Sequence, residues 1–197
     1  FRSVIKQFYA AGCRNLQLDD CTWGAIVGDV AKQRYQSLGV DIEEVKARLL
    51  KVNNLALENR PEDMVITSHI CRGNYHSTFF TSGPYDSVAD YVFAQEHVDA
   101  LLLEYDDERS GGFAPLAKVS PDKKVVLGLI TTKKPELEDK DKVIARIHEA
   151  AKYIPLERLC LSPQCGFASC EIGNKLTEEQ QWAKLALVKE IAKEVWK

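Results

Sequence analysis

The sequence predicts an α/β fold built on a parallel sheet. Five short apolar runs alternate with longer amphipathic segments along the chain. Each run is too short to form a helix and is flanked by polar residues, which is typical of buried parallel strands. The intervals between the runs leave room for helical segments, as strand–helix units require. Either a doubly wound sheet or part of an eight-stranded barrel fits this order.

Five strands are expected, and their order along the chain is Leu16–Leu18, Met64–Thr67, Ala100–Leu103, Val125–Ile130 and Leu159–Leu161. A helical segment precedes the first strand. A second segment, Ile42–Asn59, ends before Pro61 and carries apolar residues at helical spacing: Val45, Leu49, Val52 and Leu55 or Ala56. A third, Val143–Tyr153, ends before Pro155. The glycine-rich motifs that cradle phosphates follow none of the strands, so a nucleotide-binding fold has weaker support.

The last helix is predicted from its start signal and its apolar period. Thr177 and Gln180 stand three residues apart, which is the spacing of a capping box. After this start we expect the helix to bury one apolar face, made of Trp182, Leu185, Val188, Ile191 and Val195.

Composition narrows the class of protein. The 197 residues are 45% hydrophobic and 28% charged, which suits one globular domain and excludes a disordered chain. The net charge of -3 argues against a nucleic-acid binder. The longest apolar stretch, Val125–Ile130, is too short to span a membrane, and no secretory leader is seen at the start. We therefore expect a cytoplasmic protein whose six cysteines are reduced.

Residues with chemical function follow every predicted strand. In a parallel α/β protein such residues collect at the carboxyl ends of the strands. Here these ends carry two aspartates and a thiol, an imidazole and a thiol, a carboxylate, an amine and a further thiol. In chain order the segments are Asp19–Cys21, Ser68–Arg72, Glu104–Asp106, Thr131–Lys133 and Ser162–Gly166.

His69, Cys71, Glu104 and Cys165 together predict a metal site. Residues two apart on a strand face the same side, so His69 and Cys71 can reach one ion. Taken singly, each residue has a simpler explanation. A buried cysteine beside a hydrogen-bonded histidine is common, and a strand-ending acid often caps the next helix. An imidazole, two thiols and a carboxylate at one sheet edge nevertheless form a tetrahedral zinc set.

The other cysteines and histidines are expected outside this set. Cys13 and Cys160 are interpreted as small core residues. Cys21 and Cys170 are expected near the carboxyl edge of the sheet, where they could compete as ligands. Surface or supporting roles are expected for the three remaining histidines, which are His76, His97 and His148.

Four segments resemble the catalytic domain of cobalamin-independent methionine synthase, and most closely its short, single-barrel relatives. They are Gln17–Asp20, His69–Cys71, Leu103–Tyr105 and Ser162–Phe167. The resemblance implies a (β/α)8 barrel in which His69, Cys71, Glu104 and Cys165 bind catalytic zinc. It also implies that Asp19 holds the amino group of homocysteine, with Asp20 as the neighbouring candidate.

The activity implied is a zinc-dependent transfer of methyl from 5-methyltetrahydrofolate, as its polyglutamate, to homocysteine, which gives methionine. Zinc would keep the substrate sulfur as a thiolate, and Glu104, the hardest donor, would yield to it. The leaving nitrogen of the folate also needs an acid. Lys133 stands where the full-length synthases carry a histidine, and Thr131 where they carry an aspartate. Lys133 is therefore the expected catalytic acid, and the methyl donor is open to question.

Other functions stay open at this point. Within the class, another methyl donor or another thiol acceptor is the alternative. Outside it stand a metal-free lyase similar to uroporphyrinogen decarboxylase and a binding module with structural zinc, whose metal would be closed by four protein ligands.

A complete barrel of this type needs about 250 residues. Mapped onto the family, the five strands are the fourth to the eighth, so we expect an open, curved sheet that lacks the first three. Such a sheet would have an incomplete substrate pocket and show no methyl transfer by itself. Its open edge would need another chain, such as a second copy in a homo-oligomer.

Overall fold

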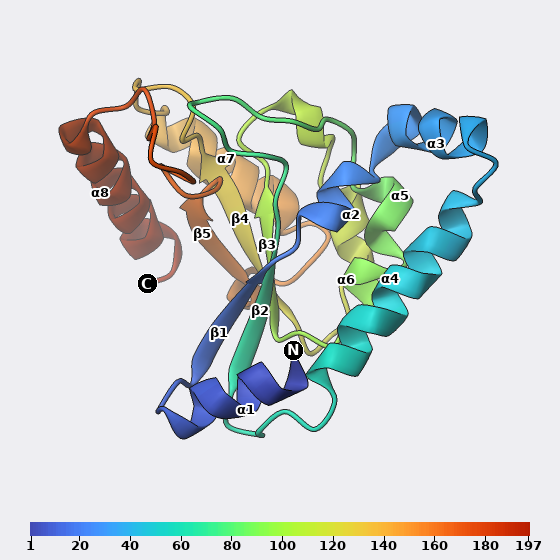
Figure 1. Ribbon diagram of the computed structural model, residues 1–197. Helices are drawn as coiled ribbons and strands as arrows, with labels where there is room; N and C mark the ends of the chain where they lie inside the picture. Colours follow the sequence, from blue (N-terminus) through green and yellow to red (C-terminus); the bar gives the residue numbers. More distant parts are fainter.

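A computed structural model describes residues 1–197 and contains one parallel sheet of five strands in the order β1-β2-β3-β4-β5 (Figure 1). The strands are β1 (Asn15–Asp19), β2 (Val65–Ile70), β3 (Ala100–Glu104), β4 (Lys124–Ile130) and β5 (Leu159–Pro163). All five predicted strands are therefore confirmed. Strand β2 extends to Ile70, three residues further than predicted, so His69 lies within the strand.

Helices occupy most of the connections between the strands. They are α1 (Arg2–Ala10), α2 (Cys21–Ala25), α3 (Gly28–Ser37), α4 (Ile42–Leu57), α5 (Asp86–Ala89), α6 (Val92–Gln95), α7 (Lys140–Ala150) and α8 (Glu178–Val195). Three short 3-10 helices are η1 (Glu108–Ser110), η2 (Ala114–Lys118) and η3 (Leu156–Arg158). None of the helices combines the length and the apolar character that a membrane span requires.

The sheet stays open, with β1 and β5 as its two edges. Figure 1 shows α1 below the starts of β1 and β2, and α8 beside β5. Helix α8 packs against both β5 and α7, whereas α2 packs against β2. Because all strands are parallel and neighbours in sequence are neighbours in the sheet, their carboxyl ends lie along one edge.

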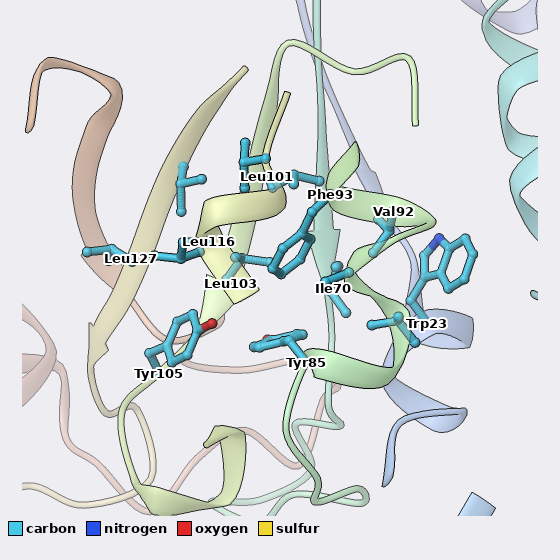
Figure 2. Packing of buried hydrophobic residues seen from close by; sticks show 14 of the residues in the cluster. Trp23, Ile70, Tyr85, Val92, Phe93, Leu101, Leu103, Tyr105, Leu116 and Leu127 are labelled. Atoms are coloured by element: carbon cyan, nitrogen blue, oxygen red, sulfur yellow. The ribbon is translucent and has the colours of Figure 1, made fainter. Parts of the chain in front are cut away.

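An aromatic cluster in the core supports the end of β3. Tyr85 contacts Phe93 and Tyr105, with ring centroids 5.6 and 5.2 Å apart, and Figure 2 shows all three among the buried side chains. The hydroxyl of Tyr85 is also 3.0 Å from the backbone nitrogen of Glu104, whose N–H it accepts. The core thereby fixes the backbone of a residue that the sequence places in the site.

Helix α4 is correctly predicted as a helix, but the residues that it buries are different. Its buried residues are Ile42, Lys46, Leu50 and Leu57, whereas Val52 and Leu55 are exposed. Asn53 explains part of this rotation. Its amide donates one hydrogen bond to Asp20 (2.7 Å) and one to Glu96 (2.9 Å), which turns the polar side chain toward the sheet.

Helix α8 starts as predicted, and both hydrogen bonds of the capping box between Thr177 and Gln180 are present. Its expected apolar face is wrong in part, because Trp182 is 59% exposed. Lys184 is fully buried, as is Ile191. The ammonium of Lys184 lies 3.0 Å from a carboxylate oxygen of Glu138 and 2.7 Å from the carbonyl of Glu136. This satisfied buried cation sets the rotation of the helix.

Candidate active site at the carboxyl edge of the sheet

His69 is the buried centre of the site. In the register of β1 and β2 it stands opposite Asp19. Its Nδ1 lies 2.9 Å from Oδ1 of Asp19, so the carboxylate orients the ring and favours a proton on Nδ1. Its Nε2 is buried and makes no hydrogen bond, and Glu104 Oε1 is 3.4 Å from it. This nitrogen therefore has a lone pair available for a metal or a proton.

The sulfurs of two cysteines lie close to His69. Cys71 directly follows β2, and Cys165 follows β5 by two residues. A ligand atom of His69 and the sulfurs of Cys71 and Cys165 all lie within 4.8 Å of one another. A second group within the same limit consists of Asp19, Cys21 and Cys71. The structure thus brings together three of the four predicted ligands and places an additional thiol beside Cys71.

Glu104, the fourth predicted ligand, is fully buried next to this group but is not part of it. Both of its carboxylate oxygens accept hydrogen bonds. Oε1 accepts one from the backbone N–H of Arg72 (2.9 Å), and Oε2 accepts from Gln164 (2.7 Å) and Arg109 (3.0 Å). The carboxylate is therefore held in place and charge-balanced without a metal.

Gln164 reaches Glu104 because the backbone of β4 lacks a side chain at Gly128. A Cβ there would lie 2.8 Å from both the Cα of Gln164 and the carbonyl oxygen of Leu103. Gln164 also accepts a hydrogen bond from the hydroxyl of Thr132 (2.8 Å), which fixes the orientation of its amide. Sequence reasoning missed Gln164 and Arg109 as supports of Glu104, although Gln164 lies inside the motif that predicted Cys165.

The titration behaviour of the site follows from these contacts. The Cys165 thiol stabilises the Cys71 thiolate, and the pKa of Cys71 falls to about 6 although burial opposes this. The pKa of Cys165 is raised in turn by its neighbour. Burial would lower the pKa of His69, but the carboxylate of Glu104 and the other nearby anions raise it overall. The pocket therefore stabilises negative charge on one sulfur and positive charge on the ring.

A metal ion fits these donors. His69 has a buried ring nitrogen without a hydrogen bond, and one of its ring nitrogens lies within 4.8 Å of both sulfurs. Such an N and S set suits zinc. The second nitrogen of the ring already has the carboxylate partner that metal-binding histidines usually have. Oε1 of Glu104 lies 3.4 Å from Nε2 of His69, beside the set.

The other predicted site residues lie around this centre. Asp20 caps α2 through the N–H of Thr22 (2.9 Å) and also binds Asn53, so it has structural partners. Lys133 is half-buried and donates to Asn74 Oδ1 at 2.6 Å. Burial lowers the pKa of Lys133, although neighbouring anions oppose the shift.

The cysteines and histidines that were expected elsewhere are indeed outside the group at His69. Cys13 and Cys160 are half-buried, Cys170 is exposed, and none of the three belongs to a group of potential ligands. His97 and His148 are exposed, and His76 is half-buried.

Two cavities open at this edge of the sheet. One of about 210 Å³ is lined by Gln17, His69, Leu102, Cys165 and their neighbours. The other, of about 400 Å³, is lined by residues that include Phe79, Thr131, Lys133 and Lys134. The first adjoins the potential metal donors, and the second adjoins the two lysines.

Comparison with known proteins places the chain in a family. Residues 1–194 match the family model described as cobalamin-independent synthase, catalytic domain. The chain belongs to this family. Its relatives include YxjH and YxjG of Bacillus subtilis, which are 52% and 50% identical over the whole chain. The chain spans about half of their length, because the match covers 52% of each.

Solved structures agree with this assignment. A protein of Listeria monocytogenes, described as a candidate vitamin-B12 independent methionine synthase, is 38% identical with a TM-score of 0.77. The match covers all of this chain and 52% of that one. A B12-independent methionine synthase from a Shewanella species, in complex with selenomethionine, is 19% identical with a TM-score of 0.73 over 98% of this chain and 52% of that one. At that identity the likeness concerns the fold.

Proposed function

We propose that the protein is a zinc-dependent S-methyltransferase that transfers the methyl group of 5-methyltetrahydrofolate to homocysteine. The observation that carries the proposal is that His69, whose Nε2 is buried and unpartnered, has a ring nitrogen within 4.8 Å of the sulfurs of Cys71 and Cys165. Membership of the cobalamin-independent synthase family supports the same conclusion. Zinc, when bound, would hold the substrate sulfur as a thiolate at neutral pH.

His69, Cys71, Glu104 and Cys165 are the residues proposed to hold zinc. Asp19 keeps the His69 ring oriented through Nδ1. Glu104 keeps hydrogen bonds to Arg72, Gln164 and Arg109 in the structure. Because these partners remain when it is not a ligand, Glu104 is the donor that a substrate thiol would displace at least cost.

The substrates have complementary groups nearby. The side chain of Asp19 is 61% exposed, and its Oδ2 makes no hydrogen bond in the structure, so this oxygen can accept from the ammonium of homocysteine. Lys133 is proposed to protonate the leaving nitrogen of the donor, because burial lowers its pKa and makes its ammonium a stronger acid. Lys133 and Lys134 line the larger cavity together with Asp106 and Asp107, and the two lysines offer cationic contacts to an anionic donor.

Lys133 favours one alternative within the same class. Even with a lowered pKa, an ammonium is a different acid from an imidazolium, and its hydrogen bond to Asn74 gives it a distinct position. A methyl donor other than the folate, or a thiol acceptor other than homocysteine, would be consistent with this change. Parallel assays that combine several methyl donors with several thiol acceptors separate these possibilities.

We also propose that the five strand–helix units are the carboxyl-terminal part of a (β/α)8 barrel. The open edges of β1 and β5 and the half-length match to the relatives support this organisation. The remaining strands would complete the substrate pockets.

X-ray absorption at the zinc edge, with and without homocysteine, tests the proposed function. We expect one oxygen or nitrogen neighbour of zinc to be replaced by a third sulfur. Homoserine, which has a hydroxyl in place of the thiol, is the matched control and should leave the spectrum unchanged. A zinc shell that homocysteine does not alter would contradict the mechanism.

A further inference from the structure

Cys21 and Cys71 lie next to each other because the strands that precede them, β1 and β2, are paired. Asp19 pairs with His69 in the parallel ladder, and the N–H of Asp20 donates to the carbonyl of His69 (2.8 Å). Two residues after Asp19 the sequence has Cys21, and two residues after His69 it has Cys71. Their sulfurs lie within 4.8 Å of each other.

The backbone around this pair is held closely together. Gly24, three residues after Cys21, packs so tightly on β2 that a Cβ would lie 2.0 Å from the carbonyl oxygen of Cys71. Asp20 fixes the start of α2 by capping it and by its bond to Asn53. Helix α2 therefore begins at a fixed position beside Cys71.

The two thiols differ in access. Cys21 is exposed, whereas Cys71 is buried. A small oxidant can thus reach Cys21 directly, and the buried Cys71 has the Cys21 sulfur within 4.8 Å of its own. A disulfide requires Cα atoms about 4.4–6.8 Å apart. The nearest paired residues, Asp19 and His69, lie two positions before the two cysteines on neighbouring strands, which are about 4.8 Å apart.

We propose that Cys21 and Cys71 form a reversible disulfide under oxidation by a hydroperoxide. One thiolate attacks the peroxide, the O–O bond breaks, and a sulfenic acid and one molecule of water or alcohol are formed. The second thiol attacks the sulfenic sulfur, the S–S bond forms, and water leaves with the second proton. Two thiols lose two electrons in total, and one hydroperoxide is reduced.

Cys165 is a less suitable partner for Cys71, although their sulfurs are also close. Cys165 follows β5, which is separated from β2 by two strands in the sheet. No backbone ladder joins β5 to β2, whereas β1 pairs directly with β2 and ends two residues before Cys21. The pairing of β1 with β2 therefore favours Cys21 as the partner.

The disulfide would remove Cys71 from the proposed zinc set and leave His69 and Cys165 with Glu104. This consequence rests on the proposed function, whereas the disulfide itself does not. Bound zinc should slow the oxidation, because its thiolate ligand is not free to react. Oxidation would therefore act mainly on the metal-free protein and prevent reloading.

The test is hydrogen peroxide treatment of the zinc-free and zinc-loaded protein, followed by thiol counting and non-reducing peptide mapping. In the zinc-free protein we expect the loss of two of the six free thiols, a Cys21–Cys71 cross-linked peptide, and recovery of both thiols with dithiothreitol. Cys21→Ser should abolish the cross-link. The matched control is Cys170→Ser, which alters another exposed thiol and should leave the cross-link intact.

A Cys71–Cys165 cross-link would overturn the proposal, as would over-oxidation of Cys21 without any cross-link. Zinc uptake, measured separately on the oxidised protein, is expected to be lost and to return on reduction. If the protein binds no zinc under any condition, the proposed function fails, but the peptide map still decides the disulfide. If zinc binds and no Cys21–Cys71 disulfide forms, only this inference fails.

Discussion

Replacing Arg109 by Met removes the cation that balances two buried carboxylates. The guanidinium lies 3.0 Å from Glu104 Oε2 and 2.8 Å from Asp106 Oδ1, and both acids are almost completely buried. It also pairs with Asp107, which is partly exposed. Methionine keeps an unbranched apolar stem next to Phe79, whose ring the guanidinium now covers. The substitution therefore removes mainly the charge and its hydrogen bonds.

Breaking a buried pair by removing one partner typically costs about 3–5 kcal/mol, because a charge is left buried and uncompensated. Glu104 keeps two other hydrogen-bond donors, Arg72 and Gln164, so the lower end of this range applies. We expect Arg109→Met to lower the free energy of unfolding by about 3 kcal/mol, a large fraction of the stability of about 5–15 kcal/mol that is usual for a domain.

Urea unfolding of the metal-free protein at neutral pH measures this loss. Lys118→Met is the control, because it breaks an exposed pair with Asp90 and should change stability by less than about 1 kcal/mol. Adding Asp106→Asn to Arg109→Met should recover part of the loss, since one unpaired charge disappears. The reasoning would be refuted if Arg109→Met lowered the free energy of unfolding by less than about 1 kcal/mol. It would also be refuted if the effects of Arg109→Met and Asp106→Asn on this free energy simply added in the double variant.

Three further predictions concern the site and its surroundings. Cys71→Ser and Cys165→Ser should each lose zinc, measured by metal analysis after gel filtration. The control Cys160→Ser should retain it. Stoichiometric zinc in either of the first two variants would remove that cysteine from the ligand set. Asp19→Asn should weaken zinc binding about 10- to 100-fold in a chelator competition, because the His69 ring loses its orienting carboxylate, and unchanged affinity would contradict that role. Burial raises the pKa of Glu96 from 4.5 to about 7, so the folded protein binds a proton more tightly than the unfolded chain. The free energy of unfolding should therefore fall by on the order of 3 kcal/mol as pH rises from the pKa of Glu96 in the unfolded chain to its pKa in the folded protein. Urea unfolding at about pH 5 and about pH 8 measures this fall, which should be smaller in Glu96→Gln. The same decline in both proteins would exclude Glu96 as its cause.

The sequence by itself determined the features that depend on neighbours along the chain. The five apolar runs predicted five strands because a short buried run has few alternatives to a parallel strand. The capping box at Thr177 was readable because both of its hydrogen bonds join residues three apart. The rule that parallel strands end at one edge predicted that His69, Cys71 and Cys165 would approach one another, and their ligand atoms lie within 4.8 Å.

Tertiary structure alone decided which partners these residues have. The rotation of α4 and α8 depends on Asn53 and Lys184, whose partners are far away in sequence. The hydrogen bonds from Gln164 to Glu104 and between Asp19 and His69 also join residues that are far apart in the sequence. Hydrogen bonds across a sheet depend on register and on the directions of side chains, which local spacing does not encode. The thiol of Cys21 is beside Cys71 for the same reason, because only the pairing of β1 with β2 brings these two segments together.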